Sequence, residues 1–187
     1  MNARRAGAVA LCMWLFGPMT SRDAHAQPGE GLLLGAGYQF LHESVERGGE
    51  SFPIGVYVDV EQPFARDSLK TWGWMGQFEG GFRSDNGFSE QLYTFLGGLR
   101  LGSARPGRWT PSGFGLIGLA TVNASCEEFC AGTASGVAVQ GGFTMTTRMN
   151  PSTLLDLTFK ASKLRIHGDG VFNVAIAGGV RFNLSRP

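Results

Sequence analysis

The residues of this chain that could carry out nucleophilic chemistry lie in two short clusters. His42, Glu43 and Ser44 are consecutive, and His167 lies two residues before Asp169. A serine nucleophile needs a histidine within hydrogen-bond reach and an acid that orients the histidine. Adjacent residues of an extended strand point to opposite faces, so sequence adjacency alone makes no such relay. We therefore expect no catalytic residues.

A second candidate for chemistry is the cysteine pair Cys126 and Cys130 in the segment CEEFC. In an oxidising compartment such a pair forms a disulfide. A metal site would need further ligands, and no histidine lies nearby in the sequence. We expect a disulfide that closes a very short loop, with no metal and no cofactor.

The N-terminal segment predicts export. Arg4 and Arg5 precede an apolar stretch that is too short to cross a bilayer, and Ala24-His25-Ala26 matches a small-x-small cleavage site. Residues 1–26 are expected to be a signal peptide, and residues 27–187 form one mature domain. That domain has 13 basic and 14 acidic residues, so a nucleic-acid partner is not expected.

Eight runs of alternating apolar and polar or small residues must position these candidates. Turn-forming segments rich in Gly, Pro, Asn and Asp separate the runs, which predicts antiparallel hairpins. Glu61–Thr71 is expected to be a turn between the second and third runs. The runs are Gly31–Leu41, Phe52–Val60, Trp72–Arg83, Gln91–Leu101, Gly113–Val122, Gly136–Thr146, Thr153–Ala161 and Phe172–Leu184.

Each run has one apolar face. In the third run this face carries Trp72, Trp74 and Phe78, and in the fifth we assign Phe114 and Leu116 to it. The opposite face carries polar or small residues, among them three acidic and three basic ones. We expect them to form an ion-pair network in the lumen, with Lys160 reaching Glu79. These charged residues are Asp59, Glu79, Arg100, Asp156, Lys160 and Arg181.

A soluble barrel would turn the apolar face inward, and a membrane barrel would turn it toward lipid. Small residues and paired charges fit a narrow eight-stranded lumen. Runs of about ten residues match a tilted membrane-spanning strand. Aromatic residues near the run ends predict an interfacial girdle: Trp72, Trp74, Trp109, Phe182, Phe40, Phe52, Phe82 and Tyr93.

With these features and the closing run Gly178–Leu184, the chain resembles small eight-stranded outer-membrane barrels of the OmpA/OmpX type. The resemblance covers residues 31–184, although the chain ends in Ser185-Arg186-Pro187 and not on an aromatic residue. It implies an all-β, closed, antiparallel up-and-down transmembrane barrel in the outer membrane of a Gram-negative bacterium. The expected partners are outer-membrane lipid, lipopolysaccharide and the barrel-assembly machinery, and a monomer is expected.

The resemblance implies a structural or surface-interaction role, with a lumen plugged by paired charges. Two alternatives stay open. Some outer-membrane barrels modify lipid A with Ser, His and acidic residues near the outer rim, which would require such residues to meet on the lipid side. A soluble eight-stranded barrel that binds a small ligand would require the apolar face to point inward.

Overall fold

The computed structural model describes residues 31–45, 48–85, 87–104, 108–126, 131–166 and 169–184. In this part of the chain no helix is long and apolar enough to cross a membrane. The described residues form eight strands: β1 (Leu33–Val45), β2 (Gly48–Arg66), β3 (Lys70–Asp85), β4 (Phe88–Ser103), β5 (Thr110–Cys126), β6 (Ala131–Asn150), β7 (Thr153–Ile166) and β8 (Asp169–Asn183).

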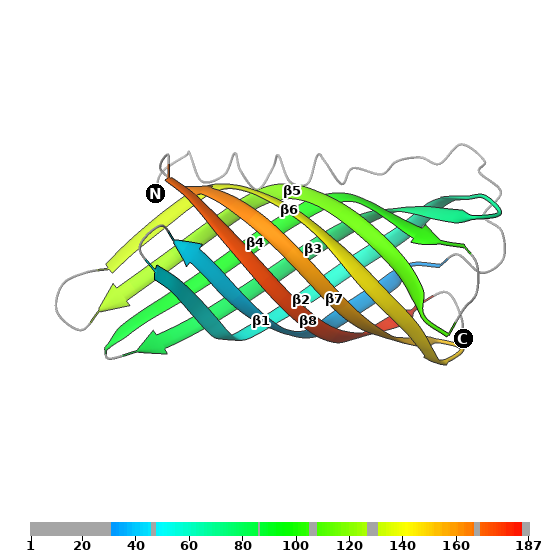
Figure 1. The fold of residues 1–187 in the computed structure, drawn as a ribbon, viewed down its shortest axis with the longest axis horizontal. Coiled ribbons are helices and arrows are strands. Elements are labelled where there is room, and N and C mark those ends of the chain that lie inside the picture. The colour runs from blue at the N-terminus through cyan, green and yellow to red at the C-terminus, as the bar shows by residue number, and fades with distance from the viewer. Residues whose placement is uncertain are drawn as a thin grey trace.

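The strands form one closed ring in sequence order, as Figure 1 shows. Each strand is antiparallel to the next, and β8 closes the ring by pairing with β1. Paired positions followed once round the ring lead from Glu43 back to Leu33 on the same strand, a stagger of ten residues. Such a stagger tilts the strands by about 35–45°. The predicted fold class, a closed up-and-down eight-stranded barrel, is confirmed.

The strands are longer than predicted, and β2 shows why. It continues to Arg66, so the prediction that Glu61–Thr71 forms a turn is wrong. Pro63 was read as a strand terminator, but an extra residue between Pro63 and Ala65 forms a β-bulge. Because proline lacks an N–H group, it is tolerated within a strand at such a bulge. Glu61 therefore lies in the sheet, with its side chain buried.

Phe52 corrects the predicted aromatic girdle. The sequence places it on the apolar outer face, whereas it faces the lumen with 0% exposure. A second β-bulge adds one residue to β2 between Phe52 and Gly55, at Pro53. Because side chains alternate with a period of two, one extra residue reverses the alternation, so Phe52 faces inward although Ile54 and Val56 face outward.

The fifth run was assigned to the wrong faces. Phe114 and Leu116 point into the lumen, whereas Ile117 and Leu119 point outward. Both faces of this strand are apolar or small, so the alternation did not decide between them. The Phe114 ring lies over Gly142 on β6, where any side chain would collide with it. The missing side chain of Gly142 therefore makes room for an aromatic ring inside the barrel.

The barrel interior is a packed core with two parts. An apolar cluster fills the half nearer the β1–β2, β3–β4, β5–β6 and β7–β8 hairpins, and we call it the apolar cap. Polar and charged side chains fill most of the other half. The apolar cap contains Leu41, Phe52, Leu92, Leu96, Ala120, Ala138, Leu164 and Ala175, with Val122, Ile166 and Val171 packed against it.

Candidate functional site

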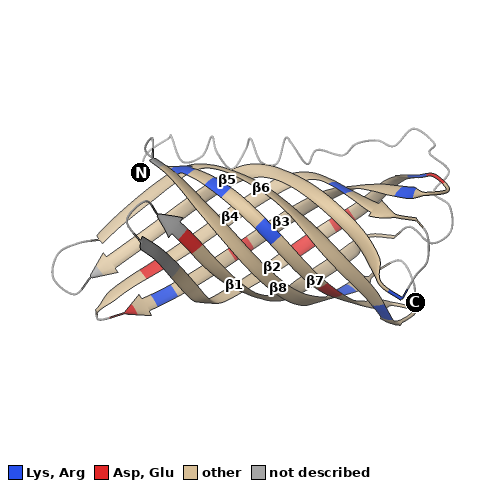
Figure 2. Ribbon diagram, in the orientation of Figure 1, with Lys and Arg blue, Asp and Glu red and all other residues tan. Residues whose placement is uncertain are grey.

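The charged residues of the lumen lie on five strands, β2, β3, β4, β7 and β8. All six predicted side chains are buried, and Glu61 joins them. The inward alternation Tyr57, Asp59, Glu61 was the signal that could have revealed the seventh residue. Figure 2 shows charged residues at scattered positions along a barrel wall that is otherwise mostly uncharged.

Arg181 is the centre of the lower cluster, near the end of the barrel where β1 begins and β8 ends. Its Nη2 lies 3.1 Å from Oδ1 of Asp59 and 3.0 Å from Oδ2 of Asp156. Its Nη1 donates to Oε2 of Glu61 at 3.1 Å. One guanidinium thus bridges three carboxylates from two strands.

Arg100 completes the lower cluster from the other side. Its Nη1 donates to the same Glu61 oxygen at 2.8 Å, and its Nε and Nη2 donate to Ser112 Oγ at 3.0 and 2.7 Å. Glu61 is therefore held between two arginines. Removing either arginine would leave buried carboxylate charge uncompensated, which is costly in a low-dielectric interior.

Lys160 and Glu79 form an ion pair across the lumen, above the lower cluster. Gln140 donates to Glu79 Oε1 at 3.0 Å, and the Lys160 ammonium lies 5.0 Å from the centre of the Tyr57 ring. Thr94 donates to the second Glu79 oxygen at 3.4 Å. Both oxygens of the carboxylate thus have partners.

Taken together, the described buried set has four acidic and three basic residues. A cavity of only about 10 Å³ remains in the lumen, beside Tyr57, Lys160 and Arg181. That volume is about the size of one water molecule. Beside these three residues the packed side chains therefore leave room for about one water molecule.

The outer face of the barrel carries a continuous belt of exposed apolar side chains. It includes seven of the eight residues predicted for the girdle: Phe40, Trp72, Trp74, Phe82, Tyr93, Trp109 and Phe182. Rings also contact one another on this face, with the Phe78 and Phe95 centroids 4.7 Å apart. Most of the belt residues are more than a third exposed, among them Tyr38, Val56, Phe95, Ile117, Val139, Phe159 and Ile176.

One histidine and one serine meet on this outer face. His42 Nδ1 lies 2.9 Å from Ser51 Oγ, across the β1–β2 pair. His42 is also paired with Val174 on β8, and Phe40 precedes it on the same face. The described neighbours therefore supply apolar contacts and no orienting acid. His42 and Ser44 were the sequence candidates, whereas Ser51 was missed because its facing depends on the bulge at Pro53.

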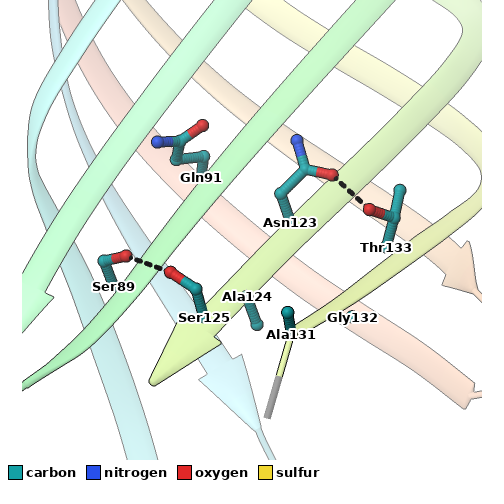
Figure 3. Close-up of a pocket in the computed structure, with 8 residues that line it drawn as sticks. All are labelled: Ser89, Gln91, Asn123, Ala124, Ser125, Ala131, Gly132 and Thr133. Atoms are coloured by element: carbon teal, nitrogen blue, oxygen red, sulfur yellow. Dashed lines mark hydrogen bonds between the residues drawn. The ribbon is translucent and has the colours of Figure 1, made fainter. Parts of the chain in front are cut away.

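A polar surface cleft of about 310 Å³ lies at the hairpin end of β4, β5 and β6, beyond the apolar belt (Figure 3). Ser89 and Ser125 share a hydrogen bond of 2.7 Å, and Thr133 donates to Asn123 at 2.9 Å. None of the eight lining residues is charged. The cleft can therefore offer hydrogen bonds to a partner but no ion pair.

Three predicted features lie outside the described residues. The signal peptide falls within residues 1–30, and the disulfide partner Cys130 and the side chain of Cys126 are not described. His167 is likewise outside the described part. Among the described residues, no group of three His, Cys, Asp or Glu side chains could hold a metal ion.

Comparison with solved structures identifies the fold. Neisserial surface protein A (NspA) superposes with a TM-score of 0.66 at 10% identity, covering 82% of this chain and 97% of that one. Ail, the attachment invasion locus protein of Yersinia pestis, gives a TM-score of 0.59 at 20% identity, covering 82% and 99%. This chain has the fold of the small outer-membrane β-barrels.

The same fold relates the chain to the N-terminal β-barrel domain of Pseudomonas aeruginosa OprF. That match has a TM-score of 0.51 at 11% identity and covers 82% of this chain and 99% of that one. No protein-family model matches the chain, and no curated protein matches it in sequence. The likeness is therefore one of architecture.

Proposed function

We propose that this chain is an integral outer-membrane protein of a Gram-negative bacterium, with a closed lumen and a surface-interaction role at its hairpin end. The observation that carries the proposal is the belt of exposed apolar side chains on every strand. On β8 the belt runs from Phe172 to Phe182, a length that crosses the hydrocarbon layer when the strand is tilted. A soluble protein would not leave such a belt in water.

The closed ring supports the same location. Unpaired backbone groups in lipid cost several kcal/mol each, and a barrel avoids them because it has no sheet edge within the membrane. We place the two termini in the periplasm, with residues 1–26 as a cleaved signal peptide and Gly178–Leu184 as the closing strand for the barrel-assembly machinery. The lower ion cluster then lies near the periplasmic mouth.

A surface role is supported by the strands that continue beyond the belt. Residues 131–135 of β6 are paired with β5 but not with β7, and residues 83–85 of β3 are paired with β4 but not with β2. At the left of Figure 1 the ends of β3 to β6 accordingly reach furthest from the barrel. This projecting sheet carries the polar cleft, and we propose that it contacts partners outside the cell.

The location is tested by heat modifiability of the protein in membrane fractions. We expect a folded form in detergent that changes its mobility only after boiling, and N-terminal sequencing that begins at Gln27. In planar bilayers the purified protein should show no sustained ionic conductance. A protein that stays in the soluble fraction with unchanged mobility would disprove the proposal.

A second candidate function, hydrolysis of acyl esters of the surrounding lipid, rests on the contact between His42 and Ser51, a pair to which the described neighbours add no orienting acid. When Nε2 carries the ring proton, Nδ1 of His42 can accept the proton of Ser51 while Oγ attacks an ester carbonyl. The leaving alkoxide takes that proton, and water then hydrolyses the acyl-serine. The pair lies on the outer face, where lipid acyl chains reach it.

This second candidate is tested by fatty-acid release from reconstituted vesicles that contain lipid A. Release should be lost in Ser51→Ala and retained in Ser135→Ala, whose serine also lies on the outer face and hydrogen-bonds Thr121 at 3.1 Å. If the wild-type protein releases no more fatty acid than Ser51→Ala does, the pair is only a structural hydrogen bond. The main proposal, a non-enzymatic barrel, would then stand alone.

A further inference from the structure

Two basic side chains near the hairpin end of β7 point away from the lumen. Lys163 and Arg165 flank Leu164, which is buried in the apolar cap. Both are exposed and continue the outward row of Leu157 and Phe159. A lysine and an arginine therefore follow directly on the lipid-facing row of the same strand.

The side chains described on the neighbouring strands do not neutralise these charges. Lys163 is paired with Val139 on β6 and Phe172 on β8, both exposed belt residues. Arg165 is paired with Val137 and Gly170. None of the outward positions that the structure describes on β6 and β8 carries an acidic residue. Two positive charges thus lie at the outer edge of the apolar belt, and no side chain described on β6 or β8 places an anion beside them.

The side chain of Lys163 extends toward the same level as Arg165. Its Cε lies 3.5 Å from the point that a Cβ on Gly170 would occupy, and Gly170 is the residue paired with Arg165. The aliphatic stem therefore extends from the level of Phe172 toward Gly170, in the direction of the hairpin end. A lysine at a membrane edge extends in this way to keep its stem on apolar surface and its ammonium among polar headgroups. The end of the Lys163 side chain thus lies close to the residue that is paired with Arg165.

We infer that Lys163 and Arg165 bind the phosphate group of an outer-leaflet lipid. A guanidinium binds phosphate through two parallel hydrogen bonds, and an ammonium adds a compact charge. Phe172 and Val139, which are paired with Lys163 and lie further into the membrane than Arg165, offer an apolar surface to the acyl chains of the same molecule. A phosphorylated lipid supplies both groups, whereas free phosphate supplies only one. The inference rests on the proposed outer-membrane location.

The position of the site also connects it with the His42–Ser51 pair. Val174, the next outward residue of β8 after Phe172, is paired with His42 on β1. One strand therefore separates the two basic residues from the histidine. A lipid held by its phosphate on β7 would extend over β8 toward that pair.

The test compares two probes on the full-length barrel in phosphatidylcholine nanodiscs: bisphosphorylated lipid A and the same glycolipid after removal of both phosphates. The variant is Lys163→Gln/Arg165→Gln, and the matched control is Lys70→Gln/Arg148→Gln. The control removes one exposed lysine and one exposed arginine at the opposite end of the barrel. Native mass spectrometry measures the retained lipid.

We expect the wild type and the control to retain the phosphorylated lipid at least tenfold better than the variant does. The dephosphorylated lipid should be retained weakly by all three. Equal retention by the variant and the wild type, or equal retention of both lipids by the wild type, would overturn the inference. Release of the lipid by equimolar inorganic phosphate would show a general phosphate site and would overturn the assignment to lipid.

Heat modifiability of each protein separates this inference from the proposed location. A variant that keeps the heat-dependent mobility shift but loses the lipid supports the phosphate site in a folded barrel. Failure of the wild type itself to enter membranes would disprove the location first. If the double variant does not fold, Arg165→Gln alone is measured, and it should lower retention at least threefold. Unchanged retention in that variant would also overturn the inference.

Discussion

His42 Nδ1 and Ser51 Oγ lie 2.9 Å apart on the outer surface because β2 carries one extra residue at Pro53. The same bulge turns Phe52 into the lumen, where it packs in the apolar cap. Without it, Ser51 would face the interior and Phe52 would face lipid. A single residue thus decides both a contact on the outside of the barrel and the packing of its core.

The bulge predicts different outcomes for two phenylalanines only twelve residues apart in the sequence. Phe52→Ala should lower the free energy of unfolding by about 3–5 kcal/mol, because it leaves a cavity in a packed interior. Phe40→Ala, at an exposed belt position, should lower it by no more than about 2 kcal/mol, since lipid closes around the shortened side chain. Urea titration of the protein in vesicles measures both values, and equal losses would contradict the opposite facing.

Alternation along the strands could predict the barrel itself, because lipid-facing and lumen-facing positions differ in character on most strands. In the neighbouring pairs Tyr38 and Gln39, and Phe95 and Thr94, one residue is apolar and the other polar, so the sequence indicates which one faces lipid. On β5, Phe114 and Ile117 are equally apolar, so the faces could only be known from the space that Gly142 leaves in the lumen. Register and β-bulges cannot be predicted from the local alternation. They decide the contact of His42 with Ser51 and the position of Glu61 between two arginines.

The lower ion cluster predicts an asymmetry between its basic and acidic members. Arg181→Met leaves Asp59 and Asp156 without their shared partner and should cost about 3–5 kcal/mol of unfolding free energy. Asp59→Asn should be far milder, because the described buried set already holds one more acidic than basic residue. Unfolding in urea at neutral pH compares the two variants. A larger loss in Asp59→Asn than in Arg181→Met would show that the arginine is not the centre of the cluster.

The turn between β2 and β3 predicts a pH dependence outside the membrane-spanning part. Backbone N–H groups of Leu69 and Lys70 donate to Oδ1 of Asp67 at 2.7 and 2.6 Å and hold the pKa of this carboxyl below its ordinary value. The stabilisation is therefore present above the unfolded-state pKa of about 3.9 and is lost as the pH falls through the lower folded-state pKa. Asp67→Asn keeps an acceptor oxygen but does not titrate there.

The difference in unfolding free energy between wild type and Asp67→Asn isolates this effect. It should be constant above about pH 5 and should shift against the wild type as the pH falls below about 4. Other carboxyl groups titrate in both proteins and cancel in the difference. A difference that does not change with pH would mean that the two backbone hydrogen bonds do not favour the charged carboxylate.

The facing of the whole barrel is tested by one substitution on each side of the wall. Phe78 lies on the outer face, where its ring packs against Phe95 in a tilted arrangement. Thr158 lies in the lumen, with its hydroxyl 3.0 Å from that of Thr144. Phe78→Arg should cost about 2–4 kcal/mol, because a charge near the middle of the bilayer has no water to solvate it.

Thr158→Ser keeps the hydroxyl and removes only a methyl group, so the change in unfolding free energy should stay below about 1 kcal/mol. Both variants are compared with wild type by urea titration in vesicles. In a soluble barrel with an apolar interior, the arginine would be buried in the core and Thr158 would be in contact with water. Phe78→Arg would then prevent folding in the absence of lipid, whereas a membrane barrel should still insert and fold in thin bilayers, where the arginine reaches the interface.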